Sequence, residues 1–162
     1  LDAAKKPSRR LGSLLAPMSA EYDVIFLDCP PGISLLSESV LHAADLLLVP
    51  LIPTTLSVRT LDQLTEFLNS FDGSRPAILA FFSMIDRRKR LHREISEQLP
   101  EERDDVAAAA IPALSLIERM AVERAPVTAF APRTVAARRY AELWQEARER
   151  TKLPEPRPTD AW

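Results

Sequence analysis

A single carboxylate stands where an α/β sheet commonly holds its ligands. The run from Tyr22 to Leu27 is rich in β-forming residues and is apolar without a break from Val24, which predicts a strand covered on both faces, and Asp28 follows it directly. Ligands of such sheets bind beyond the carboxyl ends of the strands, and a carboxylate there can hold Mg²⁺ directly or through a water. Asp28 is therefore the candidate metal ligand and catalytic residue. The alternative is that it only caps the following turn.

The residues after Asp28 could form a turn against a phosphate group. Pro30 and Pro31 stiffen the chain, and Gly32 lets a backbone N–H approach an anion closely. The sequence has no glycine-rich phosphate loop, because its three glycines are scattered and none of its four lysines follows a glycine. One turn of this kind does not make a complete nucleotide site.

A second group of residues could bind a polyanion. Seven basic side chains gather after the third predicted strand and in a later helix: Arg87, Arg88, Lys89, Arg90, Arg93, Arg119 and Arg124. Arg and Lys contact the phosphates of DNA without any sequence motif. The alternative is a solvated surface, on which these cations pair at helical spacing with acids such as Glu94 and Glu97.

The other reactive residue types indicate no further site. His42 and His92 lack the spacing of metal ligands, so we expect them at the surface or packed in helices. Cys29 is the only cysteine, which excludes an internal disulfide and fits a reducing cytosol. The net charge is -2 over 162 residues, so any contact with nucleic acid must come from a local patch. No apolar stretch approaches the roughly 20 residues that span a bilayer.

The elements that must position these residues alternate along the chain. Strands are predicted at residues 22–27, 46–52, 77–85 and 106–111, and helices at 11–18, 34–44, 55–71, 93–99, 113–124 and 134–150. This alternation predicts βαβ units and an α/β sandwich around a parallel sheet. Pro126 and Pro132 are expected to bracket an extended link. We expect one domain over residues 1–150 and a Pro-rich, disordered tail over residues 151–162.

Four segments, in order, resemble the motifs of ParA/MinD-type ATPases. Tyr22–Gly32 resembles the Walker B and switch II segment. Leu47–Pro50 with Pro53 and Thr54 resembles the next strand and turn, and Ser83–Arg88 resembles the strand end near the adenine. The last segment resembles the C-terminal signature of the chromosome- and plasmid-partitioning branch, in residues Ile111-Pro112, Ile117-Glu118, Ala125-Pro126-Val127, Ala131-Pro132, Ala136, Ala137 and Tyr140.

The resemblance implies a fold, cofactors and partners. The fold is a three-layer α/β sandwich with a mostly parallel sheet, as in P-loop NTPases. The implied activity is ATP hydrolysis with Mg²⁺ by a homodimer that forms in the ATP state and binds DNA non-specifically. By the same resemblance a ParB-like partner is expected to stimulate hydrolysis, and no contact with a membrane is expected. The expected location is the cytoplasm, in association with the nucleoid.

The resemblance also assigns roles to individual residues. Asp28 takes the place of the Walker B aspartate near Mg²⁺, and Pro30, Pro31 and Gly32 take the place of switch II, which senses the γ-phosphate. Met84 and Pro112 take the place of adenine-pocket residues, with plain packing as the alternative.

The sequence departs from this family in one large respect. The family's activity depends on an N-terminal glycine-rich loop with two lysines, and nothing in these 162 residues matches it. The first strand, its phosphate loop and switch I would all lie upstream of Leu1. We therefore expect the chain to be a C-terminal part of such a domain that does not hydrolyse ATP alone.

Two alternatives remain open at this point. The first is an ATPase of the same superfamily with another cargo, such as MinD-like positioning or regulation of cellulose synthesis. The Pro-rich end of the chain disfavours MinD-like membrane binding, because it has no basic amphipathic character. The second is a non-catalytic, truncated paralogue that acts as a binding module for an intact ATPase.

Overall fold

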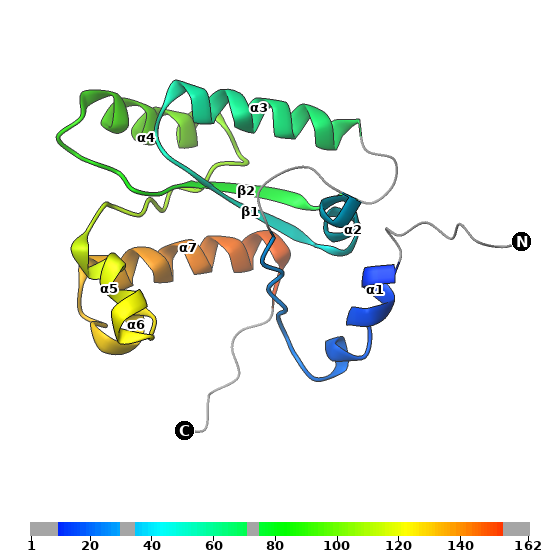
Figure 1. Ribbon diagram of the computed structural model, residues 1–162. Coiled ribbons are helices and arrows are strands. Elements are labelled where there is room, and N and C mark those ends of the chain that lie inside the picture. The colour runs from blue at the N-terminus through cyan, green and yellow to red at the C-terminus, as the bar shows by residue number, and fades with distance from the viewer. Residues whose placement is uncertain (1–9, 30–34, 71–74, 154–162) are drawn as a thin grey trace, which may run out of the picture.

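The computed structural model describes residues 10–29, 35–70 and 75–153. Within them the elements follow one another from helices into a βαβ unit and then into a helical C-terminal half (Figure 1). Their bounds are α1 Arg10–Leu15, η2 Met18–Ala20, α2 Leu35–Ala43, β1 Leu46–Leu51, α3 Thr55–Asn69, β2 Ala77–Phe82, α4 Arg90–Glu102, α5 Ser115–Glu123, α6 Val127–Phe130 and α7 Val135–Thr151. No helix of the described residues is long and apolar enough to cross a membrane.

The two strands form a parallel sheet. They pair in register from Leu46 opposite Ala77 to Leu51 opposite Phe82, and α3 connects them. A parallel connection of this kind needs a crossover, which explains why a helix separates two strands that lie side by side. The segment after α4 continues the sheet on the far side of β2 through isolated parallel bridges, Ala80 with Val106 and Ile85 with Pro112.

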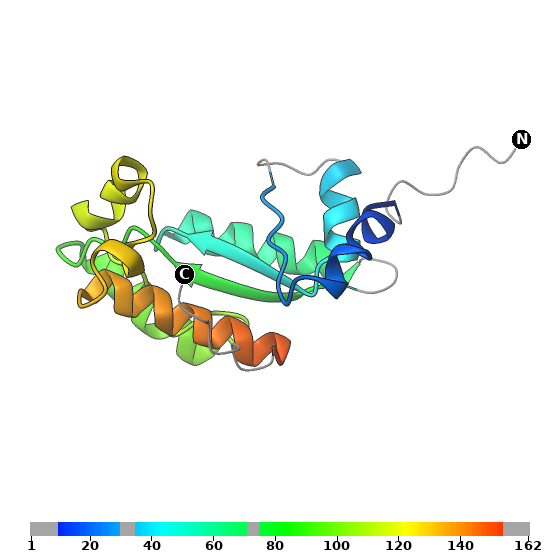
Figure 2. The same cartoon turned by 90° about the horizontal axis from the view of Figure 1, so that it is seen from below.

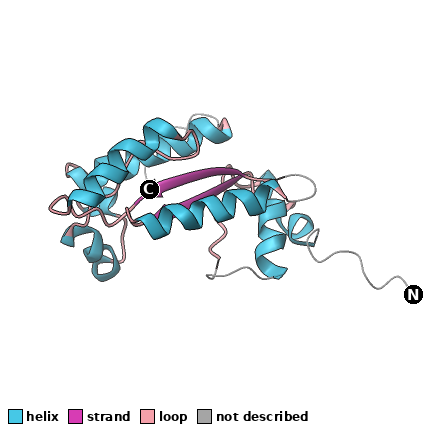
Figure 3. Cartoon of the chain, turned by 90° about the horizontal axis from the view of Figure 1, so that it is seen from above, coloured by secondary structure: helices cyan, strands magenta, loops and turns pink. Residues whose placement is uncertain are grey.

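Helices cover both faces of this sheet, as Figures 1 and 3 show. Alternate residues of β2 point to opposite faces. Ala80 and Phe82 pack with Leu61 of α3 in one core cluster, to which α4 contributes Ile95 and Leu99. Leu79 packs on the other face against Leu143 and Ala147 of α7. The predicted α/β fold class with a parallel sheet between helical layers is therefore confirmed.

Local sequence signals explain where the long helices begin. The side-chain oxygen of Thr54 accepts a hydrogen bond from the Ser57 N–H (3.2 Å) at the start of α3. Thr134 accepts one from the Ala137 N–H (3.4 Å) at the start of α7. Such N-caps satisfy backbone donors that have no partner within the helix.

The predicted strand at residues 22–27 is wrong for the described structure. These residues run as an irregular segment, and the side chains of Tyr22, Val24 and Phe26 are exposed. The ring of Phe26 lies near the ring of Trp144 on α7, with 6.1 Å between their centroids. A strand needs a neighbour that accepts and donates its backbone hydrogen bonds, and no described segment pairs with this one. Its apolar character alone could not produce a strand.

The predicted strand at residues 106–111 is also wrong as a continuous element. The N–H groups of Ala108 and Ala109 donate to the carboxylate of Glu146 on α7, at 2.9 and 2.7 Å. Arg150 of the same helix donates to the carbonyl oxygens of Ile78 (3.2 Å) and Asp104. Side chains of α7 therefore form hydrogen bonds with backbone groups beside β2. These groups would otherwise pair two strands continuously, and only isolated bridges remain.

The predicted extended link between Pro126 and Pro132 is wrong, because the chain between them is mostly helical. Residues Val127–Phe130 form the short helix α6, and Val127 is buried. Pro126 precedes the helix with φ -67°, a position where its missing N–H costs nothing. The expected tail lies mostly outside the described residues, and α7 continues to Thr151.

We expect the 162-residue chain to self-associate through its open sheet edge. Among the described residues β1 has a strand neighbour on one side only, and the apolar segment at residues 22–27 is exposed. Unpaired apolar edges template pairing with another chain. Sedimentation velocity at rising concentration should show oligomers, and Val24→Lys with Phe26→Lys should reduce them.

A matched control adds the same charge elsewhere. Ser19 and Gln63 are exposed polar residues, so Ser19→Lys with Gln63→Lys should leave the oligomers in place. A monomeric parent at every concentration, or equal loss of oligomers in both variants, would contradict an apolar edge as the cause.

Candidate functional site

The predicted metal ligand lies on the surface. Asp28 is exposed at the end of the irregular segment, and Cys29 beside it is exposed as well. Pro30, Pro31 and Gly32 lie outside the described residues. Over the part of the chain that the structure describes, no three His, Cys, Asp or Glu side chains gather closely enough to hold a metal ion.

The two predicted adenine-side residues come together at the end of the sheet. The Ile85 N–H donates to the Ile111 carbonyl (3.2 Å), and the Ala113 N–H donates to the Ile85 carbonyl (3.0 Å). These bonds place Met84 beside the Pro112 segment. Met84 has φ 55° and a side chain that is 61% exposed. A bulky residue in the left-handed region is strained, and such strain collects at functional positions.

The two halves of the predicted nucleotide site are apart in this structure. In Figures 1 and 2 the blue segment that leads to residue 29 lies away from the loop after β2 and from α5. A strand at residues 22–27, paired into the sheet, would have been the element that aligned Asp28 with the ends of β1 and β2. Because that strand does not form, the segment that carries Asp28 is not aligned with the ends of β1 and β2.

A structured turn carries the first part of the basic cluster. The Asp86 carboxylate accepts the Arg88 backbone N–H (3.0 Å) and both the Nε and Nη2 groups of Arg88 (3.0 Å each). The Lys89 N–H donates to the Asp86 carbonyl (3.0 Å), which closes the turn. The hydrogen bonds from Arg88 lower the pKa of Asp86 to about 2.

We expect the Asp86–Arg88 pair to be visible in an NMR titration of the Asp86 carboxyl. The pKa is depressed in the folded chain, so the pair's stabilising contribution is present above about pH 4 and is lost as the pH falls through about 2. Arg88→Gln should return the pKa toward 3.8, whereas Arg87→Gln should not. A midpoint near 3.8 in the parent chain would show that this contact is absent in solution.

The seven predicted DNA-binding cations divide into two groups. In the first group the cations already have partners: Arg88 with Asp86, Arg90 with Glu94 (2.6 Å), Arg93 with the Arg87 carbonyl (2.7 Å) and Arg119 with Glu123 (2.6 Å). The Arg90–Glu94 pair is one of the helical ion pairs that the alternative expected, and Arg119 with Glu123 forms another i,i+4 pair on α5.

The second group consists of Arg87, Lys89 and Arg124. All three are exposed, and within residues 10–29, 35–70 and 75–153 none of them has an ion pair or a side-chain hydrogen bond. A cation without an internal partner loses no existing bond when it meets a phosphate. These three side chains are therefore the best placed to bind an anion.

Sequence reasoning missed the residue beneath this turn. His92, in the first turn of α4, is buried, and its Nδ1 accepts the Asp86 backbone N–H at 3.2 Å. The packed position fits one of the two expectations for this histidine. Its role as an acceptor has no sequence signal, since it depends on how the turn folds back over the helix.

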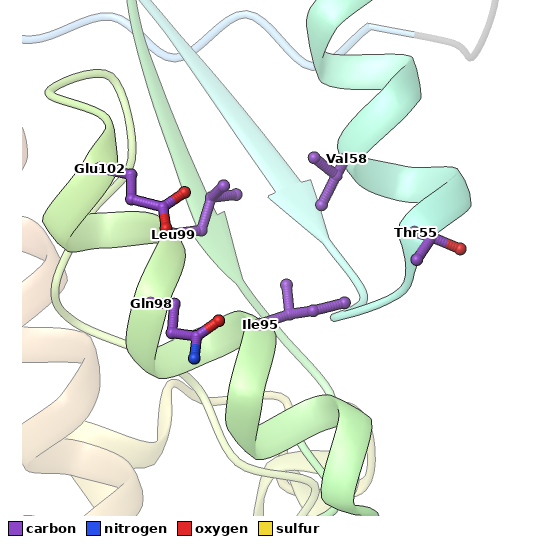
Figure 4. A pocket seen from close by; sticks show the side chains of 6 residues that line it. All are labelled: Thr55, Val58, Ile95, Gln98, Leu99 and Glu102. Carbon is purple, nitrogen blue, oxygen red and sulfur yellow. The ribbon is translucent and has the colours of Figure 1, made fainter.

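A separate hollow of about 220 Å³ lies between α3 and α4 (Figure 4). Its floor is apolar, and it contains none of the predicted site residues. The lining residues are Thr55, Val58, Ile95, Gln98, Leu99 and Glu102.

Comparisons with known proteins agree with the resemblance seen in the sequence. The profile of a family described as an AAA domain matches residues 1–81. Chromosome partitioning protein ParA of Myxococcus xanthus is 34% identical over 94 residues, which cover 56% of this chain and 33% of that protein. Chromosome-partitioning ATPase Soj of Treponema pallidum is 26% identical over 141 residues, 84% of this chain and 56% of its own length.

A third relative aligns over a similar range. Sporulation initiation inhibitor protein Soj of Bacillus subtilis is 26% identical over 142 residues, which are 85% of this chain and 56% of that protein. The chain belongs to the AAA-domain family of ParA-like ATPases. It spans between a third and just over half of the length of these relatives.

Proposed function

We propose that the chain is part of a ParA-like ATPase that partitions chromosomal or plasmid DNA. The observation that carries this proposal is the alignment of a protein named as a chromosome-partitioning ATPase over 84% of the chain. In this proposal the ATP-bound form is a homodimer, which binds DNA non-specifically at the nucleoid. A ParB-like protein stimulates its ATP hydrolysis.

The described residues do not fit Mg²⁺-ATP by themselves. Asp28 is an exposed carboxylate, Met84 and Pro112 lie at another part of the fold, and the free cations Arg87, Lys89 and Arg124 belong to the loop after β2 and to α5. A triphosphate needs backbone N–H groups and a cation close to its charges. We infer that Asp28, residues 30–32 and the Met84–Pro112 edge complete a nucleotide site only together with a phosphate loop from elsewhere.

We expect no sub-millimolar binding of Mg-ATP to the 162-residue chain in isothermal titration calorimetry. The matched sample is a chimaera in which the N-terminal part of a ParA relative, with its phosphate loop, precedes this chain. The chimaera should bind ATP, because it supplies the N–H groups and lysines that neutralise the phosphates. Micromolar binding of Mg-ATP by the chain alone would overturn the proposal that the site needs a phosphate loop from elsewhere.

The duplex-binding part of the proposal rests on the free cations. Arg87 and Lys89 lie on the turn after β2, and Arg124 ends α5 with a left-handed φ of 49°. The loop after β2 and helix α5 share one end of the molecule in Figure 1. These three unpaired charges would give weak binding by a monomer, and a dimer would double their number.

One alternative function stays open. It is a non-catalytic module that pairs with an intact ATPase. Co-sedimentation with such an ATPase, in the presence and absence of ATP, separates the two. A stoichiometric complex together with an inactive chimaera would favour the binding module.

A further inference from the structure

The turn that carries the basic cluster is built over a buried histidine. His92 is 6% exposed, so its ring cannot reach a ligand at the surface. It lies in α4, three residues after Lys89, and the turn at residues 86–89 folds back over it. Its one printed bond is to the backbone of that turn, where Nδ1 accepts the Asp86 N–H at 3.2 Å.

This bond fixes the state of the ring. A nitrogen that accepts an N–H carries no proton, so the neutral ring holds its proton on Nε2. Without the acceptor, the Asp86 N–H would have no partner at the base of the turn. A buried donor without a partner is costly, and the backbone would move to satisfy it.

Two further contacts fix the same turn. The Asp86 carboxylate holds the Arg88 N–H and guanidinium, and Nη1 of Arg93 donates to the Arg87 carbonyl at 2.7 Å. The three contacts hold the backbone on both sides of Arg87 and up to Lys89. The only side chains of the turn that remain free are those of Arg87 and Lys89.

We propose that His92 is a positioning residue for anion binding: it accepts the Asp86 N–H, and so holds the turn that directs Arg87 and Lys89 toward a DNA phosphate. The proposal rests on the duplex binding argued above. Pre-organisation is its physical basis, because a turn that is already ordered loses less conformational freedom when it binds.

The test compares variants that separate hydrogen bonding from packing. In His92→Asn the amide oxygen stands close to the position of Nδ1, so the acceptor is kept while ring volume is lost. In His92→Leu volume is kept and the acceptor is lost. Hydrogen–deuterium exchange of peptides covering residues 83–93, read by mass spectrometry, reports on the turn. Fluorescence anisotropy of the ATP-bound chimaera with a random-sequence duplex reports on binding.

We expect His92→Leu to speed exchange in this segment at least about fivefold and to weaken duplex binding at least about fivefold, since one lost hydrogen bond changes an equilibrium by about that factor. His92→Asn should stay within about twofold of the parent in both measurements. Equal behaviour of the parent and His92→Leu, or equal loss in both variants, would overturn the proposal. If His92→Leu fails to fold, His92→Gln replaces it, because its amide oxygen extends past the Nδ1 position.

The two readouts separate this inference from the proposed function. An ATP-bound chimaera with the parent sequence that fails to bind duplex removes the DNA role and the positioning role with it, whatever the exchange data show. A parent chimaera that binds duplex, with binding unaffected by His92→Leu, removes the role of His92 alone.

Discussion

Replacing Asp28 with Ala lowers the rate of ATP hydrolysis by about 10- to 100-fold in the chimaera described above, if this carboxylate supports Mg²⁺ as proposed. A carboxylate that holds a metal through a water orients the cation and the attacking water more than it binds nucleotide. Loss of the carboxylate should therefore lower the rate of hydrolysis and change the Kd for ATP by less than about tenfold. Steady-state hydrolysis and calorimetry on the same sample measure the two effects.

The control for this substitution is Glu21→Ala. Glu21 is an exposed carboxylate at the beginning of the same irregular segment, so its removal changes net charge equally. Turnover should stay within about twofold of the parent, as for most surface substitutions. Normal turnover with lost ATP binding in Asp28→Ala would mean that Asp28 is structural and that another carboxylate supports the metal.

The second large effect concerns DNA. Neutralising the free cations, in Arg87→Gln with Lys89→Gln, should weaken duplex binding by the ATP-bound chimaera on the order of 100-fold at low salt. Each chain loses two charges, and a dimer loses four. The slope of log K against log salt should therefore fall by about 3.6, since each phosphate contact contributes about 0.9. Gel shifts at several salt concentrations give both quantities for any sequence of duplex.

The matched control removes the same number of charges from cations that are already paired. Arg90 bonds to Glu94 and Arg119 bonds to Glu123, each at 2.6 Å on a helix surface. Arg90→Gln with Arg119→Gln should leave the salt slope within about one unit of the parent, and stability should change little because such pairs contribute about 0.3–0.5 kcal/mol. Equal losses in both double variants would mean that net charge, and not the free cations, determines binding.

The βαβ unit could be predicted from the sequence because its signals are local. The apolar run at residues 46–52 became β1, the run beginning at Ala77 became β2, and Thr54 marked the start of α3. These features depend on a few neighbouring residues and on burial between two helical layers. The end of β2 was placed three residues too late, because the left-handed φ of Met84 turns the chain.

The two strands that were predicted wrongly depend on distant partners. Residues 22–27 have the composition of a buried strand, but no described segment pairs with them. Residues 106–111 lie along β2, yet Glu146 takes two of their N–H groups. Neither a missing neighbour nor a competing carboxylate 38 residues away is visible in a window of sequence.

The candidate site was predictable as a set of residue types and not as an arrangement. The family motifs predicted Met84 and Pro112 at one site, and the parallel bridge between Ile85 and Pro112 brings their two segments side by side. The division of the basic cluster was not predictable, since it depends on rotamers and on the turn at Asp86. The acceptor role of His92 depends on the same turn.

The bonds between α7 and the sheet have a consequence for synthesis of the chain. The acceptor for Ala108 and Ala109 is Glu146, and the donor to Ile78 is Arg150, 72 residues further along. While the ribosome is still adding α7, these backbone groups have only water as a partner, and the face of the sheet that carries Leu79 is uncovered. At about 5–20 residues per second, several seconds separate the emergence of β2 from that of the helix that covers it. During that interval the nascent βαβ unit exposes an apolar sheet face, and exposed surface of this kind makes unfinished chains prone to aggregation.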